Sequence, residues 1–290
     1  MIPARDEERY LGATLESLSR QDFRGGVEVV VVDNGSTDGT AGVAAAHGAT
    51  VVAEPEPGVC AARAAGTRVA RGEIVVSTDA DTTHPADWLS RIDEAFRDAG
   101  NGCVAVAGPC RYTEAPMWAS LFTGLLFGLV ALVARLTGRV TYVTATNTAF
   151  RRDAQPGYDT RLTQGGDELD LLRRLRRRGR VVFDPGLVVA TSSRRLCRGW
   201  LHTLVVTVVV GYVVAYAVNR VARRRVVGTA PSCPDLPAVR RRAPHRRPQP
   251  RLVPLVALSL TALLLVAGGR AAGHAGEVAG TLHAMWSQLR

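Results

Sequence analysis

Apolar and polar residues alternate along the first part of the chain in blocks that predict strands and helices in turn. Residues 27–32 read VEVVVV, a continuous β-branched run of the kind that is buried on both faces of a parallel sheet. The turn-forming residues DNGSTDGT follow it directly and include residue types that begin helices. The same alternation predicts further strands over 50–53, 73–78 and 103–108, and helices over 40–47, 59–70 and 85–99. This order of elements predicts a doubly wound α/β sheet, with ligands at the carboxyl ends of its strands.

The chain opens with what reads as the end of another strand. The residues MIPA precede an acidic triplet, DEE at 6–8, which suits the start of a helix. That helix would carry three leucines at helical spacing, Leu11, Leu15 and Leu18. We therefore expect a first strand that has lost its beginning, as a start codon assigned too late would explain.

Charge divides the chain into two parts. Residues 1–190 hold 21 Arg against 24 Asp and Glu, a net charge of −3, whereas residues 191–290 hold 15 Arg against 2 acids, a net charge of +13. Long apolar runs interrupt the basic part. Basic residues mixed with such runs favour an anionic membrane surface over a nucleic acid as the partner.

Acidic residues follow two of the predicted strands. Asp33 ends the first of them, and Asp79 and Asp81 flank Ala80 at the end of the strand over 73–78. A single Asp at such a place is common in turns, but the ends of parallel strands meet at one edge of a sheet. Converging carboxylates are hard ligands that suit Mg²⁺ or Mn²⁺, which would bridge them to a diphosphate. A metal ion there would offset the charge on a departing nucleotide diphosphate.

Together these motifs resemble the family 2 glycosyltransferases, which have the GT-A fold. The resemblance spans roughly residues 1–195 and rests on PARDEE at 3–8, VVVVDNGSTDGT at 29–40, TDAD at 78–81 and GDELDL at 166–171. It implies a GT-A, Rossmann-like mixed sheet and an enzyme that uses a nucleotide-diphosphate sugar. Processive members of the family usually carry a Gln-x-x-Arg-Trp motif, which is absent here, so we expect a single transfer.

The resemblance also implies roles for individual residues. The nucleotide sugar would be bound by Pro3, Arg5, Glu7, Val31, Asp33, Arg63, Asp79, Ala80 and Asp81. Among these, Asp33 would contact the base or ribose, and Asp81 would be the main metal ligand, beside Asp79. Thr146 and Asn147 would line the acceptor and sugar pocket. Arg194 or Arg195 could touch the diphosphate.

A carboxylate in a Glu-Asp pair serves the family as general base, which deprotonates the acceptor hydroxyl for inverting attack. Here the order is reversed to Asp167-Glu168. Alignment on Leu171 puts Glu168 in the place of the base, with Asp167 as the alternative. The two acids also suit the N-terminus of the predicted helix over 167–178 through its dipole, whether or not they react. That helix would place Leu169, Leu172 and Leu175 on one face.

Three apolar runs approach the length that spans a bilayer, at 115–134, 201–218 and 252–268. The first lies between Asp81 and Glu168, so a single crossing would separate the metal site from the base. We therefore expect an interfacial helix over 115–135, with an ordinary core helix as the alternative.

The segment between the second and third runs, 219–251, holds ten Arg, one acid and many Pro, which predicts a basic disordered loop. The positive-inside rule places this loop in the cytoplasm, where nucleotide sugars are made. Both conditions hold if 196–218 is a membrane-associated helix and only 252–268 crosses, with 269–290 as a tail. A hairpin of two crossing helices that breaks the rule is the alternative.

These observations predict an inverting, metal-dependent glycosyltransferase at the cell membrane, with its catalytic domain on the cytoplasmic face. The donor would be a nucleotide-diphosphate sugar, and the acceptor a lipid-linked or cell-envelope glycan. No nucleic acid is expected as a partner. Two alternatives stay open: a nucleotidyltransferase that uses the same Asp-Ala-Asp, and a catalytically degenerate relative that acts as a membrane scaffold.

Overall fold

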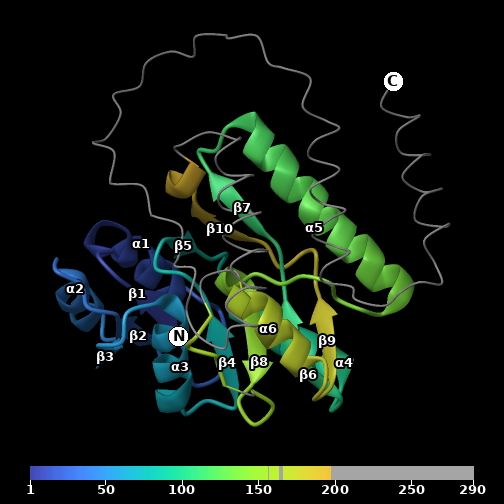
Figure 1. Cartoon of the computed structure of the whole chain (residues 1–290), viewed down its shortest axis with the longest axis horizontal. Helices are drawn as coiled ribbons and strands as arrows, with labels where there is room; N and C mark the ends of the chain where they lie inside the picture. The colour runs from blue at the N-terminus through green and yellow to red at the C-terminus, as the bar shows by residue number, and fades with distance from the viewer. Residues whose placement is uncertain (156, 163–165, 197–290) are drawn as a thin grey trace. The chain divides into compact units, whose positions relative to one another are not determined.

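The computed structural model describes residues 1–155, 157–162 and 166–196 (Figure 1). The predictions for the later part of the chain lie outside the described residues. These are the apolar helix up to residue 218, the basic loop 219–251, the helix 252–268 and the tail 269–290.

The N-terminal part forms a parallel sheet with helices on both faces. Its elements are β1 (Ile2–Ala4), α1 (Glu8–Ser19), β2 (Val30–Asp33), α2 (Thr40–Ala46), β3 (Thr50–Ala53) and α3 (Val59–Val69). The strands pair in the order β1-β2-β3. Val31 of β2 packs with Leu11 of α1, whereas Val30 and Val32 pack with Ala62 of α3. Successive strand residues point to opposite faces, so this apolar run is buried on both, as predicted.

The next part forms a mixed sheet of four strands. Its elements are β4 (Ile74–Ser77), α4 (Trp88–Ala99), β6 (Cys103–Ala107), β8 (Thr148–Arg151) and β9 (Arg180–Phe183). The order is β4-β8-β6-β9, in which β8 is antiparallel to both neighbours and β6 is parallel to β9. Trp88, Ile92 and Phe96 of α4 pack with Val106 in the core of this part.

Met1 connects the two sheets. Its amino group donates a hydrogen bond to the carbonyl of Val76 at 2.9 Å, and its carbonyl accepts one from the amide of Thr78 at 3.2 Å. Bonds from one residue to partners two apart are the pattern of a parallel ladder. The beginning of β1 therefore lies beside the end of β4, and the two sheets continue into one another as a mixed α/β sheet (Figure 1).

A third, smaller sheet places the last described residues near the end of β4. It consists of β5 (Thr82–Thr83), β7 (Cys110–Thr113) and β10 (Val189–Ser192) in the order β5-β10-β7. Because β10 pairs with β5, the amide of Ser192 donates to the carbonyl of Asp81 at 3.1 Å. The short helices η1 (Ala145–Asn147) and η2 (Arg194–Leu196) and the helix α6 (Gly166–Leu175) complete the description.

The first apolar run forms the helix α5 (Met117–Thr137), which by length and composition could cross a membrane. One side of α5 packs on the fold through Leu126, Phe127 and Val130, which are buried. The other side is apolar and exposed: Met117, Leu121, Leu125 and Leu136 keep between 46% and 71% of their surface accessible. The prediction of a helix here is confirmed, and in the described structure it is half buried.

Candidate active site

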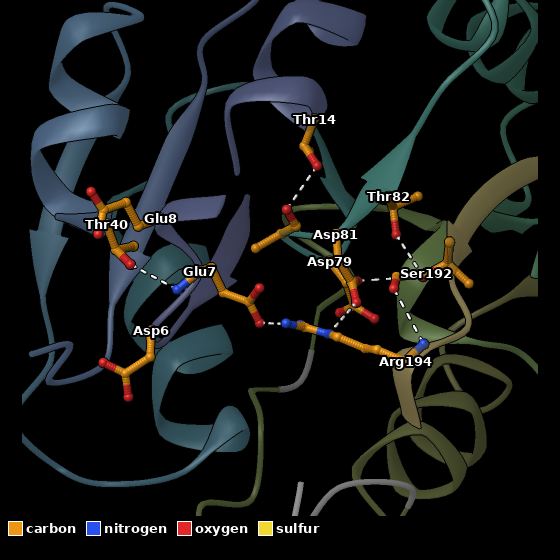
Figure 2. Close-up of polar contacts among 12 residues, drawn as sticks. Asp6, Glu7, Glu8, Thr14, Thr40, Asp79, Asp81, Thr82, Ser192 and Arg194 are labelled. Atoms are coloured by element: carbon orange, nitrogen blue, oxygen red, sulfur yellow. Dashed lines mark hydrogen bonds and ion pairs between the residues drawn. The ribbon is translucent and has the colours of Figure 1, made fainter. Parts of the chain in front are cut away.

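Three strand ends bring charged residues together. Glu7 follows β1, Asp81 follows β4, and Arg194 follows β10. Figure 2 shows the Arg194 side chain reaching past Asp81 to Glu7. Its Nη2 donates to Oε1 of Glu7, and its Nε donates to Oδ2 of Asp81 at 3.1 Å. The guanidinium also lies over the ring of Tyr10, 4.5 Å from the ring centre. Burial lowers the pKa of Arg194 and its acidic partners raise it, with a net upward shift, so its positive charge is secure.

A second arginine joins the Asp-Ala-Asp motif to the acidic pair of α6. Arg63 of α3 is 2% exposed, and it donates to Oδ1 of Asp79 at 3.1 Å and to Oδ2 of Asp167. Burial opposes this charge and the carboxylates of Asp167 and Asp79 favour it, and the pKa of Arg63 is raised overall. The other oxygen of Asp79 accepts a hydrogen bond from Oγ1 of Thr146 at 2.7 Å. The predicted metal-site acid and the predicted reactive pair therefore belong to one connected network.

Glu168 lies beside this network in the first turn of α6 and is buried. Its Oε1 accepts from the amide of Ala145 at 2.8 Å, and its Oε2 accepts from the hydroxyl of Tyr142 at 3.1 Å. Burial, followed by the charge of Asp167, raises the pKa of Glu168 to about 8. A carboxylate with such a pKa can take up a proton near neutral pH.

The loop after β2 lies beside the loop after β1. Asp33, at the end of that strand, accepts a hydrogen bond from the amide of Ser36 at 3.0 Å and is half exposed. The amide of Glu7 donates to Oγ1 of Thr40 at 2.8 Å, so the loops after β1 and β2 are tied together (Figure 2). Asn34 follows Asp33 in the chain. Its side-chain amide donates to two carbonyls of the loop before α3 and accepts a hydrogen bond from the backbone amide of Gly58 at 2.7 Å. Pattern reasoning did not single out Asn34, because an Asn in a turn has no distinguishing signal.

The family model of glycosyl transferase family 2 matches residues 1–155, more than half of the chain. The chain belongs to glycosyltransferase family 2. An uncharacterized glycosyltransferase of Mycobacterium tuberculosis is 42% identical over 92 residues, which are 32% of this chain and 40% of that protein. The 4,4'-diaponeurosporenoate glycosyltransferase of Staphylococcus aureus is 50% identical over 52 residues, 18% of this chain and 13% of that protein. The family 2 chain thus spans less than half the length of these curated relatives.

Solved structures agree on the fold. Glucosyl-3-phosphoglycerate synthase from Mycobacterium tuberculosis, in complex with Mn²⁺, uridine diphosphate and glucosyl-3-phosphoglycerate, has a TM-score of 0.51 at 23% identity over 77% of each chain. TarS 1–349 of Staphylococcus aureus, in complex with UDP, has a TM-score of 0.53 at 21% identity, covering 66% of this chain and 59% of that one. At these identities the likeness shows the fold alone, and it confirms the predicted GT-A class.

The remaining residues that the family resemblance selected lie around this network at different depths. Arg5 is exposed, with its Nε 3.9 Å from Oδ2 of Asp6. Four others belong to the framework: Pro3 pairs with Val32 between strands, Val31 and Ala80 are core residues, and Asn147 is fully buried. The amide of Asn147 accepts from the indole of Trp88 at 2.9 Å and donates to two carbonyls. Its place in an acceptor pocket, like the binding of a nucleotide sugar by Arg63, stays a prediction.

The metal that the family implies can be tested against the side chains present. Among the described residues, no three His, Cys, Asp or Glu side chains cluster as a complete metal site. Arg63 and Thr146 donate to Asp79, and Arg194 donates to Asp81, so a cation at either carboxylate would replace a hydrogen-bond donor. That Asp81 is the main ligand stays a prediction. Mg²⁺ is commonly held by one or two carboxylates together with substrate phosphates. The donor set therefore fits a divalent cation that shares Asp81 with the diphosphate of a bound donor.

Proposed function

We propose that this family 2 chain is an inverting glycosyltransferase that moves one sugar from a nucleotide-diphosphate sugar to an acceptor hydroxyl. The observation that supports it best is the bridge from Asp79 through Arg63 to Asp167. This bridge sets the acidic pair of α6 beside the Asp-Ala-Asp motif in a single buried network. Inverting transfer needs both a donor diphosphate site and a nearby proton acceptor.

Glu168 is the proposed base, with Asp167 as the alternative. The acceptor oxygen would attack the anomeric carbon as its proton passes to the carboxylate, while the bond to the nucleotide diphosphate breaks on the opposite side of the sugar. With its pKa raised to about 8, Glu168 is a stronger base than an ordinary carboxylate once it has lost its own proton, and it can then accept the proton of the hydroxyl. Asp167 is engaged by Arg63 and would have to exchange that ion pair for the proton. A divalent cation, when bound at Asp81, would offset the charge of the leaving diphosphate.

The acceptor that we propose is a lipid-linked or cell-envelope glycan, met at the cytoplasmic face of the cell membrane. This rests on the exposed apolar side of α5, formed by Met117, Leu121, Leu125 and Leu136, and on the excess of Arg after residue 190. A helix with such a side can lie in a membrane interface, and nearby arginines attract anionic lipids.

Donor binding tests the proposal directly. We would follow the melting temperature of the purified chain with UDP-, GDP- and dTDP-sugars, with and without Mn²⁺, beside Asp81→Asn. The solved structures in complex with UDP make uracil the first base to try. A rise in melting temperature that needs both Mn²⁺ and Asp81 would support a transferase site. Turnover of nucleoside triphosphates would favour a nucleotidyltransferase instead, and a folded protein that responds to no donor would favour a scaffold.

A further inference from the structure

Arg194 places a positive charge on the carboxylate that the proposed metal needs. Its Nε lies 3.1 Å from Oδ2 of Asp81, and its Nη2 contacts Glu7 on the opposite side of the site (Figure 2). The Asp81 side chain is only 6% exposed, so this oxygen is shielded from most other partners. One guanidinium thus pairs with two acids that come from different strand ends.

Backbone and side-chain hydrogen bonds hold Asp81 against β10, whereas the Arg194 side chain is partly exposed to solvent. The carbonyl of Asp81 is bonded to the amide of Ser192, and Oδ1 lies 3.4 Å from Oγ1 of Thr191, both in β10. The Arg194 side chain keeps 21% of its surface exposed and rests against the ring of Tyr10. A cation that used Oδ2 of Asp81 would meet the like charge of the guanidinium at a few ångströms, so both cannot occupy that oxygen.

We propose that Arg194 is a built-in competitor of the divalent cation. Before the donor binds, it is paired with Asp81 and Glu7. When the donor arrives with its cation, Arg194 yields Asp81 and turns its charge to the diphosphate. This inference deepens the proposed function and rests on it. It has a direct consequence: the cation alone binds weakly, and cation and donor strengthen each other's binding by the same factor.

The test is the affinity for Mn²⁺ alone, with no donor present, followed through the electron paramagnetic resonance signal of free Mn²⁺. Removing the charge in Arg194→Gln, which keeps much of the side-chain length, should tighten Mn²⁺ binding by about 10- to 100-fold, because the ion no longer displaces a charged hydrogen-bond partner. Arg194→Lys, which retains the charge, should bind Mn²⁺ about as weakly as the unaltered chain. The double variant Asp81→Asn with Arg194→Gln should lose the gain.

A matched control separates this effect from a general change in charge. Arg97 on α4 is exposed and pairs with Asp93 in its own helix, so Arg97→Gln removes the same charge elsewhere. It should leave Mn²⁺ affinity unchanged. If Arg194→Gln folds, by circular dichroism, and binds Mn²⁺ no tighter than the unaltered chain, Arg194 does not compete and the inference is wrong.

Uridine diphosphate binding keeps this inference distinct from the proposed function. In the unaltered chain, Mn²⁺ should strengthen UDP binding strongly, and in Arg194→Gln that coupling should shrink. If Arg194→Gln binds Mn²⁺ more tightly but neither protein binds nucleotide, Arg194 competes with the cation and the transferase proposal is wrong. Nucleotide binding with the same Mn²⁺ coupling in both proteins would retain the transferase and reject the competition.

Discussion

At the scale of single residues, burial sets the protonation state of groups that a sequence shows only as letters. Glu168 and His84 are the two clearest cases, and their shifts run in opposite chemical directions. Burial favours the neutral form of each, so it raises the pKa of the acid to about 8 and lowers the pKa of the imidazole to about 3. Each shift has a measurable consequence.

The raised pKa of Glu168 affects the expected rate of sugar transfer. If Glu168 is the base, kcat/KM should rise as the pH increases through about 8, because the carboxylate must lose its proton before it can accept one. Glu168→Gln should lower nucleotide release by about 10²- to 10⁴-fold. Glu168→Asp should keep part of the rate. An unaffected Glu168→Gln beside an inactive Asp167→Asn would move the base to Asp167.

The lowered pKa of His84 affects the expected stability of the fold in acid. His84 accepts or donates hydrogen bonds with Ser17 at 2.9 Å and Thr78 at 2.8 Å, and it stacks on Trp88. Below its ordinary pKa of 6.5 the unfolded chain takes a proton that folded His84 refuses, so stability is lost as the pH falls from 6.5 toward 3. This group alone should cost about 1.4 kcal/mol for each pH unit in that range.

Urea unfolding at several pH values measures this loss. His84→Asn keeps polar atoms in the pocket and removes the titration, so its free energy of unfolding should fall less steeply between pH 6 and 4. Equal slopes for both proteins would mean that His84 does not control the acid sensitivity.

At the scale of elements, the site is held by contacts between strand ends and helix starts. Arg63 ties the middle of α3 to the end of β4 and the first turn of α6. Arg194 ties η2 to the ends of β1 and β4. The chain thus positions its acids by pairing them with arginines from other elements.

Removal of Arg63 should show how much depends on this pairing. Arg63→Met would leave the half-buried Asp79 and the buried Asp167 without their shared partner, which should reduce the free energy of unfolding by about 3–5 kcal/mol. Adding Asp167→Asn should recover part of the loss, since one uncompensated charge disappears. Chemical denaturation of the two variants measures both values, and a double variant no more stable than the single one would argue against the charge explanation.

At the scale of the whole molecule, the exposed side of α5 and the Arg-rich part after residue 190 bear on where the protein works. We expect the full chain to float with vesicles that contain anionic lipid. Leu121→Asp with Leu125→Asp should weaken vesicle binding by more than about tenfold, because each leucine contributes about 1.5–3 kcal/mol when buried in an apolar phase. Val27→Asp, at an exposed residue outside α5, is the control. Unchanged flotation of the α5 variant would show that this helix does not contact lipid.

The local pattern predicted the first half of the fold well and the second half poorly. The strands and helices from β1 to α4 and β6 appear where the pattern placed them, except that the first long strand begins at Val30 and α4 begins at Trp88. The pattern missed β5, β7, β8, β9 and β10, because short strands that pair across long stretches of sequence leave little local periodicity. In α6, Leu171 is buried and Leu169 only partly so, since the acids of the first turn also face the interior.

Much of the candidate site was accessible from the sequence for a physical reason. Acids that directly follow buried strands, such as Asp33 and Asp81, must lie at the edge where the strands end. The ion pairs of the site were not accessible, because Arg63 reaches Asp79, and Arg194 reaches Asp81, from other elements. A sequence read one segment at a time does not record such contacts.

The hydrogen bonds of Met1, between β1 and β4, bear on which part of the molecule unfolds first. In the described residues, the backbones of β1 and β4 are joined directly by the two hydrogen bonds of Met1, and Thr14 of α1 and Arg63 of α3 add side-chain contacts to the residues after β4. Because so few backbone bonds join the two sheets, we expect the first sheet to open as a cooperative unit before global unfolding. Amide hydrogens in β2 should then exchange with deuterium sooner than those in β6. A donor held by both Glu7 and Asp81 would span this junction, and its binding should slow exchange across β1–β3 most of all. Mass spectrometry of deuterium uptake with and without nucleotide measures this difference. Slower uptake in β1–β3 with nucleotide would show that the ligand stabilises the contact between the two sheets.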